Sequence, residues 1–177
     1  MKEDKLQHPA LIEVKASLSA ADDGAVEGLA WPFGTPDRVG DMIEKGAFSG
    51  SAVPIPMLFG HNPNDPVGVW EAVEETSEGL RVKGRLLVAE VGRAREVQAM
   101  VKSGAVRGLS IGFITKKASA RRGGGRTITS LELAEISLVT IPMHPKAGLR
   151  GTKAGADAIA LAEAINRAAS ALRSSRG

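Results

Sequence analysis

The chain has 177 residues, a length that fits one domain with a modest tail and allows one buried core. Its formal net charge is only +3 and aromatic residues make up 3%, without tyrosine, so a surface that stacks nucleic-acid bases is not expected. The sequence contains no cysteine, no signal peptide and no apolar run of 18 residues, which excludes disulfides and thiolate metal sites and predicts a soluble, intracellular protein outside membranes.

Short alternating apolar and polar runs dominate the first half of the chain, as expected for half-buried strands joined by turns. Residues 1–10 have no periodicity and are predicted to be a flexible N-terminus. Strands are predicted over residues 11–18, 25–31, 56–59, 67–75 and 80–88. The Gly- and Pro-rich segment before the third strand is predicted to be a loop, with a short helix at residues 47–52.

The second half begins with a change of period. Ala94, Val97 and Met100 recur at helical spacing before Gly104, which predicts an amphipathic helix over residues 89–103. A strand over 106–115, a basic and disordered glycine-rich loop over 116–125, and a long strand over 126–141 are expected next. An alanine-rich segment, 152–173, has one apolar stripe and predicts a terminal helix, docked on the barrel or offered to a partner.

These elements predict a mainly β fold with added helices. We expect a closed or nearly closed antiparallel β-barrel of six to seven strands, with one inserted helix and a C-terminal helix. The domain boundaries follow as a flexible N-terminus (1–10), a barrel domain (11–150) and a C-terminal helical tail (151–177).

Ser110 is the candidate nucleophile, because it stands in an apolar strand between Gly108 and Gly112. Residues two apart share one face of a strand, so the two glycines leave the hydroxyl open to approach. The same glycines can instead mark a bulge or close strand packing. The match to G-x-S-x-G does not indicate an α/β-hydrolase, because the strand continues after the serine and no convincing histidine follows the acid.

His61 and Glu135 are the candidate base and orienting acid. His61 follows an apolar strand, where a rigid scaffold can present a reactive group, although a satisfied surface histidine is the alternative. Glu135 has apolar neighbours, so its carboxylate needs a partner; that partner is a histidine ring or the cation of a cross-strand salt bridge. Glu132, on the opposite face by alternation, is the second choice. Serine, base and acid together form the set that activates a hydroxyl for acyl transfer.

Several segments around these residues resemble one family. They are DRVGD at 37–41 with GAF at 46–48, GHN at 60–62, GRL at 84–86, GAVRGLSIGF at 104–113 and EISLVTIP at 135–142. In this order and combination they resemble the HK97-type phage prohead maturation proteases, whose barrel is similar to that of the herpesvirus assemblin proteases. The resemblance covers residues 10–150, approximately.

The resemblance implies a serine endopeptidase inside a procapsid, which cuts the scaffolding segment from the major capsid protein and eventually cuts itself. It assigns the base to His61 and the nucleophile to Ser110. Assemblins place a second histidine on the next strand, where this chain has Glu135; His144 is the alternative third member. The implied partners are the major capsid protein and its scaffolding segment, with a homodimer or higher oligomer formed through the terminal helix. The implied location is the host cytoplasm, within the assembling procapsid. No cofactor, metal or nucleic-acid partner is expected.

Two other functions compete with this one. A metal-dependent hydrolase would use His61, Asp65 and His144, although no helix presents a compact ligand pair such as H-E-x-x-H. A non-catalytic capsid or scaffold-binding barrel would bind partners through the terminal helix. For the protease, the backbone around residues 142–144 is the candidate oxyanion hole, and the basic loop 116–126 either guides substrate or is slack.

Overall fold

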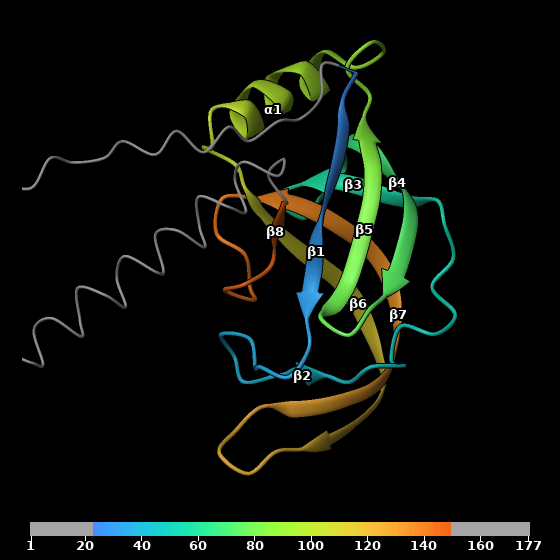
Figure 1. Cartoon of the computed structure of the whole chain (residues 1–177), viewed down its shortest axis with the longest axis vertical. Coiled ribbons are helices and arrows are strands. Elements are labelled where there is room, and N and C mark those ends of the chain that lie inside the picture. The colour runs from blue at the N-terminus through green and yellow to red at the C-terminus, as the bar shows by residue number, and fades with distance from the viewer. Residues whose placement is uncertain (1–22, 150–177) are drawn as a thin grey trace, which may run out of the picture.

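In the computed structural model, seven of the eight strands close into a barrel, β2 extends the sheet at β7, and one helix lies outside (Figure 1). The structure describes residues 23–149. The strands are β1 (Ala25–Pro32), β2 (Met42–Ile43), β3 (Ile55–Phe59), β4 (Asn62–Glu75), β5 (Gly79–Leu86), β6 (Gly108–Ala120), β7 (Arg126–Val139) and β8 (Gly148–Leu149), and the helix is α1 (Gly92–Lys102). Their order is β2-β7-β3-β4-β5-β1-β8-β6, and the pairing of β6 with β7 closes the barrel.

The predicted mainly β barrel is confirmed, but its sheet is mixed rather than wholly antiparallel. β7 runs parallel to both β2 and β3, whereas the other pairs are antiparallel. Neighbours joined by a hairpin must be antiparallel, but β3 and β7 are separated by β4, β5, α1 and β6, so no tight turn fixes their relative direction. Sequence alternation indicates the strands and does not indicate which distant strands pair.

The barrel core is formed by apolar residues that alternate along the strands. Trp70, Leu109, Ile136 and Leu138 are fully buried. The indole Nε1 of Trp70 donates a hydrogen bond of 2.9 Å to the carbonyl of Ile136, which satisfies a polar group inside the core. Because Leu109 faces inward on β6, its neighbour Ser110 faces outward. The core pattern therefore fixes the face on which Ser110 lies.

Two local predictions were wrong. Residues 47–50 form turns and residues 51–52 have no regular structure, so the short helix predicted there is not formed. The segment 116–125 is not a disordered loop, because β6 continues to Ala120 and β7 begins at Arg126. The basic residues of this hairpin have acceptors on a distant loop: Arg126 pairs with the carboxylate of Asp41, and Arg121 donates to the carbonyl of Gly40. These contacts with the distant loop hold the tip of the hairpin in place. The composition of residues 116–125 alone does not indicate such contacts.

The helix α1 matches its prediction and buries Ala94, Val97 and Val101. Within residues 23–149 no helix combines the length and hydrophobicity needed to cross a bilayer. The predicted strand at 11–18 and the predicted helix at 152–173 lie outside the described residues. The division into 1–10, 11–150 and 151–177 therefore stays a prediction.

Candidate active site

The ladder between β6 and β7 places Ser110 and Glu135 on one face. Ser110 pairs with Ser137, and Gly112 pairs with Glu135. Residues directly opposite each other in an antiparallel pair share a face of the sheet. Leu109, Ile136 and Leu138 belong to the core cluster, so the face that carries Ser110 and Glu135 is the outer one.

A bulge decides that the acid reaches this outer face. Along β7, Leu133 pairs with Phe113 whereas Glu135 pairs with Gly112, which leaves Ala134 as one extra residue. Leu133 and Ile136 are both buried even though strict alternation would separate them. Glu132, assigned by alternation to the opposite face from Glu135, therefore also faces outward. The carboxylate of Glu132 pairs with Lys116 at 2.6 Å, and its side chain is 59% exposed.

His61 is delivered by a sharp turn between β3 and β4. β3 runs beside β7, with Leu58 opposite Ser137, and Gly60 donates its N–H to the carbonyl of Leu138 at 3.0 Å. Gly60 has a φ of 63° and His61 a φ of 61°. A histidine rarely adopts the left-handed region, and such residues persist only where their surroundings hold them. The turn folds the chain back so that the imidazole lies over β7.

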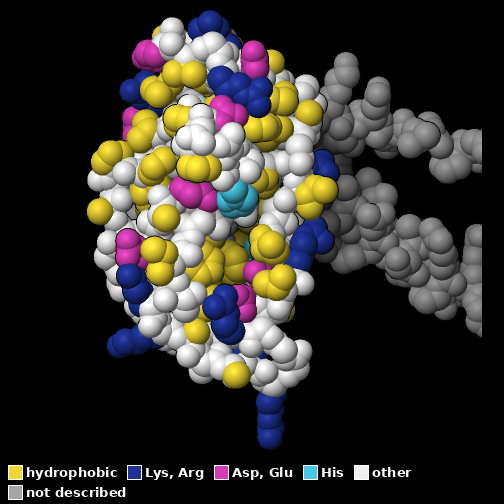
Figure 2. Space-filling view, turned by 180° about the vertical axis from the view of Figure 1, so that it is seen from behind, with side chains coloured by type: hydrophobic (Ala, Val, Ile, Leu, Met, Phe, Trp, Pro, Cys, Tyr) yellow, Lys and Arg dark blue, Asp and Glu magenta, His cyan; other side chains and the backbone are white. Residues whose placement is uncertain are grey.

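The His61 ring contacts the acid directly. His61 Nδ1 lies 2.6 Å from Glu135 Oε1, and Ser137 Oγ lies 2.7 Å from Glu135 Oε2. With Glu135 ionised, both of its oxygens can only accept, so Nδ1 carries the ring proton and Nε2 has a free lone pair. The side chain of Glu135 is 14% exposed and that of His61 is 45% exposed. Figure 2 shows a histidine side chain at the surface near the centre of one face, beside an acidic side chain.

The two glycines around Ser110 have different roles. A Cβ at position 112 would overlap Glu135 Oε1 and lie 2.9 Å from Glu135 Cδ, so the acid occupies the space that a side chain there would need. A Cβ at position 108 would lie 2.8 Å from Pro142 Cδ, so Gly108 allows the segment after β7 to pack closely. Close packing, one of the two interpretations of these glycines, therefore holds at both positions.

Ser110 itself is 5% exposed. Within residues 23–149 its hydroxyl makes no hydrogen bond, and none joins it to the His61 ring. The structure thus brings His61 and Glu135 into contact and places Ser110 on the same face of the adjacent strand, opposite Ser137. A base, an acid and a serine on one wall are the components of nucleophilic catalysis.

The alternative residues have other partners. His144 is 2% exposed; its Nδ1 accepts from the N–H of Lys146 at 3.2 Å, and its Nε2 lies 3.1 Å from the carbonyl of Thr35. Burial lowers the pKa of His144, which favours the neutral ring. Asp65 pairs with Arg93 at 3.2 Å. Among residues 23–149 no group of three or more potential metal ligands is assembled, and the set His61, Asp65 and His144 is not brought together.

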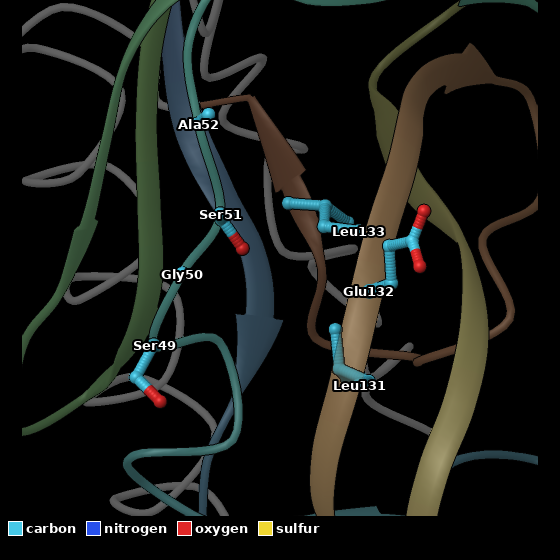
Figure 3. A pocket seen from close by; sticks show the side chains of 7 residues that line it. All are labelled: Ser49, Gly50, Ser51, Ala52, Leu131, Glu132 and Leu133. Carbon is cyan, nitrogen blue, oxygen red and sulfur yellow. The ribbon is translucent and has the colours of Figure 1, made fainter.

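A cavity of about 410 Å³ lies farther along β7 (Figure 3). It is bounded by the loop Ser49–Ala52 on one side and by Leu131–Leu133 on the other. The hydroxyl of Ser51 is buried without a hydrogen-bond partner in the described part of the chain. The lining contains none of the three candidate catalytic residues, although it ends two residues before Glu135 along the strand.

Sequence reasoning missed Ser137, which contacts both the acid and the backbone of the histidine. Its position two residues after Glu135 was an available signal, because such residues share a strand face. Its second contact, to a turn seventy-six residues away, could not be read from local pattern.

Comparison with known proteins identifies the family of the chain. The profile of the caudovirus prohead serine proteases matches residues 11–159. The chain belongs to the caudovirus prohead serine protease family.

Within and around this family, two relatives are similar in sequence. The chain is 34% identical over 137 residues to the prohead protease of Enterobacteria phage HK97, a match that covers 73% of this chain and 60% of that protein. It is 38% identical over 126 residues to the capsid polyprotein of Pseudomonas phage PAJU2, covering 67% of this chain and 19% of the polyprotein. The chain thus spans less than two thirds of either relative.

Among solved structures, the barrel is similar to the KSHV protease in complex with a hexapeptide phosphonate inhibitor. The TM-score is 0.47 and the sequence identity 16%, over 71% of this chain and 63% of that one.

Proposed function

We propose that this member of the family is a serine endopeptidase in which Ser110 is the nucleophile, His61 the general base and Glu135 the acid that orients the base. The observation that carries the proposal is the 2.6 Å hydrogen bond between His61 Nδ1 and Glu135 Oε1, on the barrel face that also carries Ser110. Only Nδ1–H can donate to the carboxylate, so the lone pair of Nε2 is available to a hydroxyl.

Catalysis then follows two matched half-reactions. The hydroxyl proton of Ser110 moves to His61 Nε2 while Oγ bonds to the peptide carbonyl carbon and the carbonyl π electrons move to its oxygen. When the carbonyl re-forms, the C–N bond breaks and the imidazolium gives its proton to the leaving amine. Water repeats the sequence on the acyl-enzyme. Glu135 stabilises the imidazolium in both halves. The Nε2–Oγ hydrogen bond forms in the substrate complex, because catalytic hydrogen bonds often tighten only there.

The oxyanion hole is assigned to the segment that follows β7. The N–H groups of Met143 and His144 make no hydrogen bond within residues 23–149. Pro142 packs against Gly108, which stands two residues before Ser110. Arg38 also contacts this segment, with its backbone N 3.2 Å from the carbonyl oxygen of Met143 and its Nε 3.2 Å from that of Pro142. Free N–H groups on a pinned segment beside the nucleophile fit the requirement for preorganised donors.

The proposed substrate is the major capsid protein with its scaffolding segment, and then the protease itself. The names of the two relatives, a prohead protease and a capsid polyprotein, support this choice. The proposed location is the host cytoplasm, inside the assembling procapsid. A homodimer or higher oligomer formed through the 151–177 tail belongs to the same proposal.

The test is co-expression with the cognate capsid protein, followed by mass spectrometry of the products. Ser110→Ala and His61→Ala are expected to fold and to abolish cleavage, while Glu135→Ala reduces it less completely. Ser119→Ala, an exposed serine on the same strand, is the matched control and should cleave normally. Processing by Ser110→Ala at the wild-type rate would refute the assignment, and inhibition by a chelator would favour a metal-dependent hydrolase.

A further inference from the structure

Ser137 joins the base and the acid through a single hydroxyl. The residue is 0% exposed. Its Oγ lies 3.0 Å from the backbone N of His61 and 2.7 Å from Glu135 Oε2. It also stands directly opposite Ser110 in the ladder, so it occupies the centre of the group formed by the three candidate catalytic residues.

The chemistry of the partners fixes the direction of both bonds. A backbone N–H can only donate and an ionised carboxylate can only accept, so the hydroxyl accepts from His61 and donates its one proton to Glu135. The first bond stabilises the left-handed backbone of His61, whose φ is 61°. The second bond holds Oε2, which leaves Oε1 presented to His61 Nδ1. The Ser137 side chain thus constrains both the backbone that carries the imidazole of His61 and the carboxylate of Glu135 that the imidazole contacts.

We propose that Ser137 is a positioning residue that sets the geometry of the His61–Glu135 pair and thereby the orientation of His61 Nε2 toward Ser110. This inference rests on the proposed protease function. Hydrogen-bonded partners of a functional side chain fix its orientation and are worth measurable activity in other sites. The effect of Ser137 on reactivity therefore depends on Glu135, which a merely satisfied buried hydroxyl would not require.

That dependence separates positioning from a structural role. If Ser137 acts partly through Glu135, removing its hydroxyl slows the reaction more when Glu135 is present than when it is absent, because only the bond to the His61 N–H is then left to lose. If Ser137 only supports the barrel, its removal slows the reaction by the same factor in both backgrounds. A double-mutant cycle on reactivity measures this difference.

The assay follows the reaction of the full chain with a fluorophosphonate probe, which modifies an activated serine and requires no known cleavage site. We expect Ser137→Ala to slow labelling of Ser110 by roughly 3- to 10-fold, the equivalent of one ordinary hydrogen bond. In the Glu135→Ala background the same change should slow labelling by a clearly smaller factor than in the wild type. Ser130→Ala, another serine on β7, is the matched control and should label at the wild-type rate.

Proton NMR gives an independent measurement. The wild type should show a downfield, slowly exchanging Nδ1–H resonance from His61, and Ser137→Ala should broaden it. The backbone N–H of His61 should exchange slowly in the wild type, although the side chain of His61 is 45% exposed. This exchange measurement tests the bond even if Ser137→Ala does not fold.

The outcomes distinguish the two proposals. Labelling of Ser110→Ala as fast as wild type overturns the protease assignment itself. If Ser110→Ala is not labelled but Ser137→Ala is labelled at the wild-type rate, the positioning role is overturned and the triad stands. The same holds if Ser137→Ala slows labelling by an equal factor with and without Glu135. Fast exchange of the His61 N–H also overturns the positioning role.

Discussion

Replacing Gly112 by alanine tests whether the acid must occupy the space beside the serine strand. A Cβ at this position would overlap Glu135 Oε1 and lie 2.9 Å from both Cδ and Cγ of that side chain. Contacts this short force one group to move, and here the nearest atoms are the end of a side chain rather than backbone. The carboxylate is therefore expected to shift away from β6 and lengthen its 2.6 Å bond to His61.

The expected magnitude is large for activity and small for stability. A displacement of about 1 Å at a catalytic group can cost on the order of 100-fold in rate, so we expect a 10- to 100-fold loss in labelling of Ser110. The φ of Gly112 is not in the left-handed region, so alanine suits its backbone and gains about 0.4–1 kcal/mol by restricting the unfolded chain. This gain offsets part of the cost of moving Glu135, so the melting temperature should change by no more than about 3 °C.

The measurements are the fluorophosphonate labelling rate and thermal unfolding followed by circular dichroism. Gly92→Ala is the matched control, because a Cβ there meets only the end of Arg95 at 3.5 Å and lies at the start of α1. It should retain wild-type reactivity. A folded Gly112→Ala protein that labels Ser110 at the wild-type rate would show that the position of Glu135 does not control the nucleophile.

Three further predictions concern stability. Burial lowers the folded-state pKa of His144 below its unfolded value of about 6.5, so the unfolded chain binds the proton more strongly. The melting temperature should therefore fall as pH drops below about 6.5. In His144→Gln the melting temperature should depend less on pH over this range. The hydrogen bond from Arg126 lowers the pKa of Asp41, so the pair stabilises the fold above about pH 3.9, and this stabilisation is lost as pH falls through the lower folded-state pKa. In urea unfolding, Asp41→Asn should therefore cost about 1–2 kcal/mol at pH 7. The difference in stability from wild type should shrink toward about pH 3. Trp70→Phe removes the indole N–H that donates to the buried carbonyl of Ile136 and should lower the unfolding free energy by about 1–3 kcal/mol. An unchanged denaturation midpoint would contradict the role given to that bond.

Alternation and helical spacing determined the elements around the site. Apolar residues recur with a period of two in β1, β4 and β5 and at helical spacing in α1. These patterns can be read from each segment alone, because the buried positions of each segment are the apolar ones. His61, Ser110 and Glu135 were identified as candidates from residue type and apolar surroundings. The structure brings His61 and Glu135 into contact, while the catalytic roles of all three residues stay predictions.

The hairpin of β6 and β7 shows where local pattern fails. Its lysines, arginines and glycines predicted disorder because the acceptors that order it, Asp41 and the carbonyl of Gly40, lie on a loop about eighty residues earlier. The bulge at Ala134 likewise has no local marker, and it reverses the face on which Glu132 was expected.

The sequence by itself determined which side chains are available for chemistry and which face of each strand is apolar, because hydrophobic periodicity is a local property of the chain. Only the tertiary structure decided that β3 lies parallel to β7, that the acid fills the space above Gly112 and that Ser137 ties the acid to the histidine turn. Those contacts join residues far apart in the chain, and their geometry depends on strand register and a bulge, which alternation does not specify.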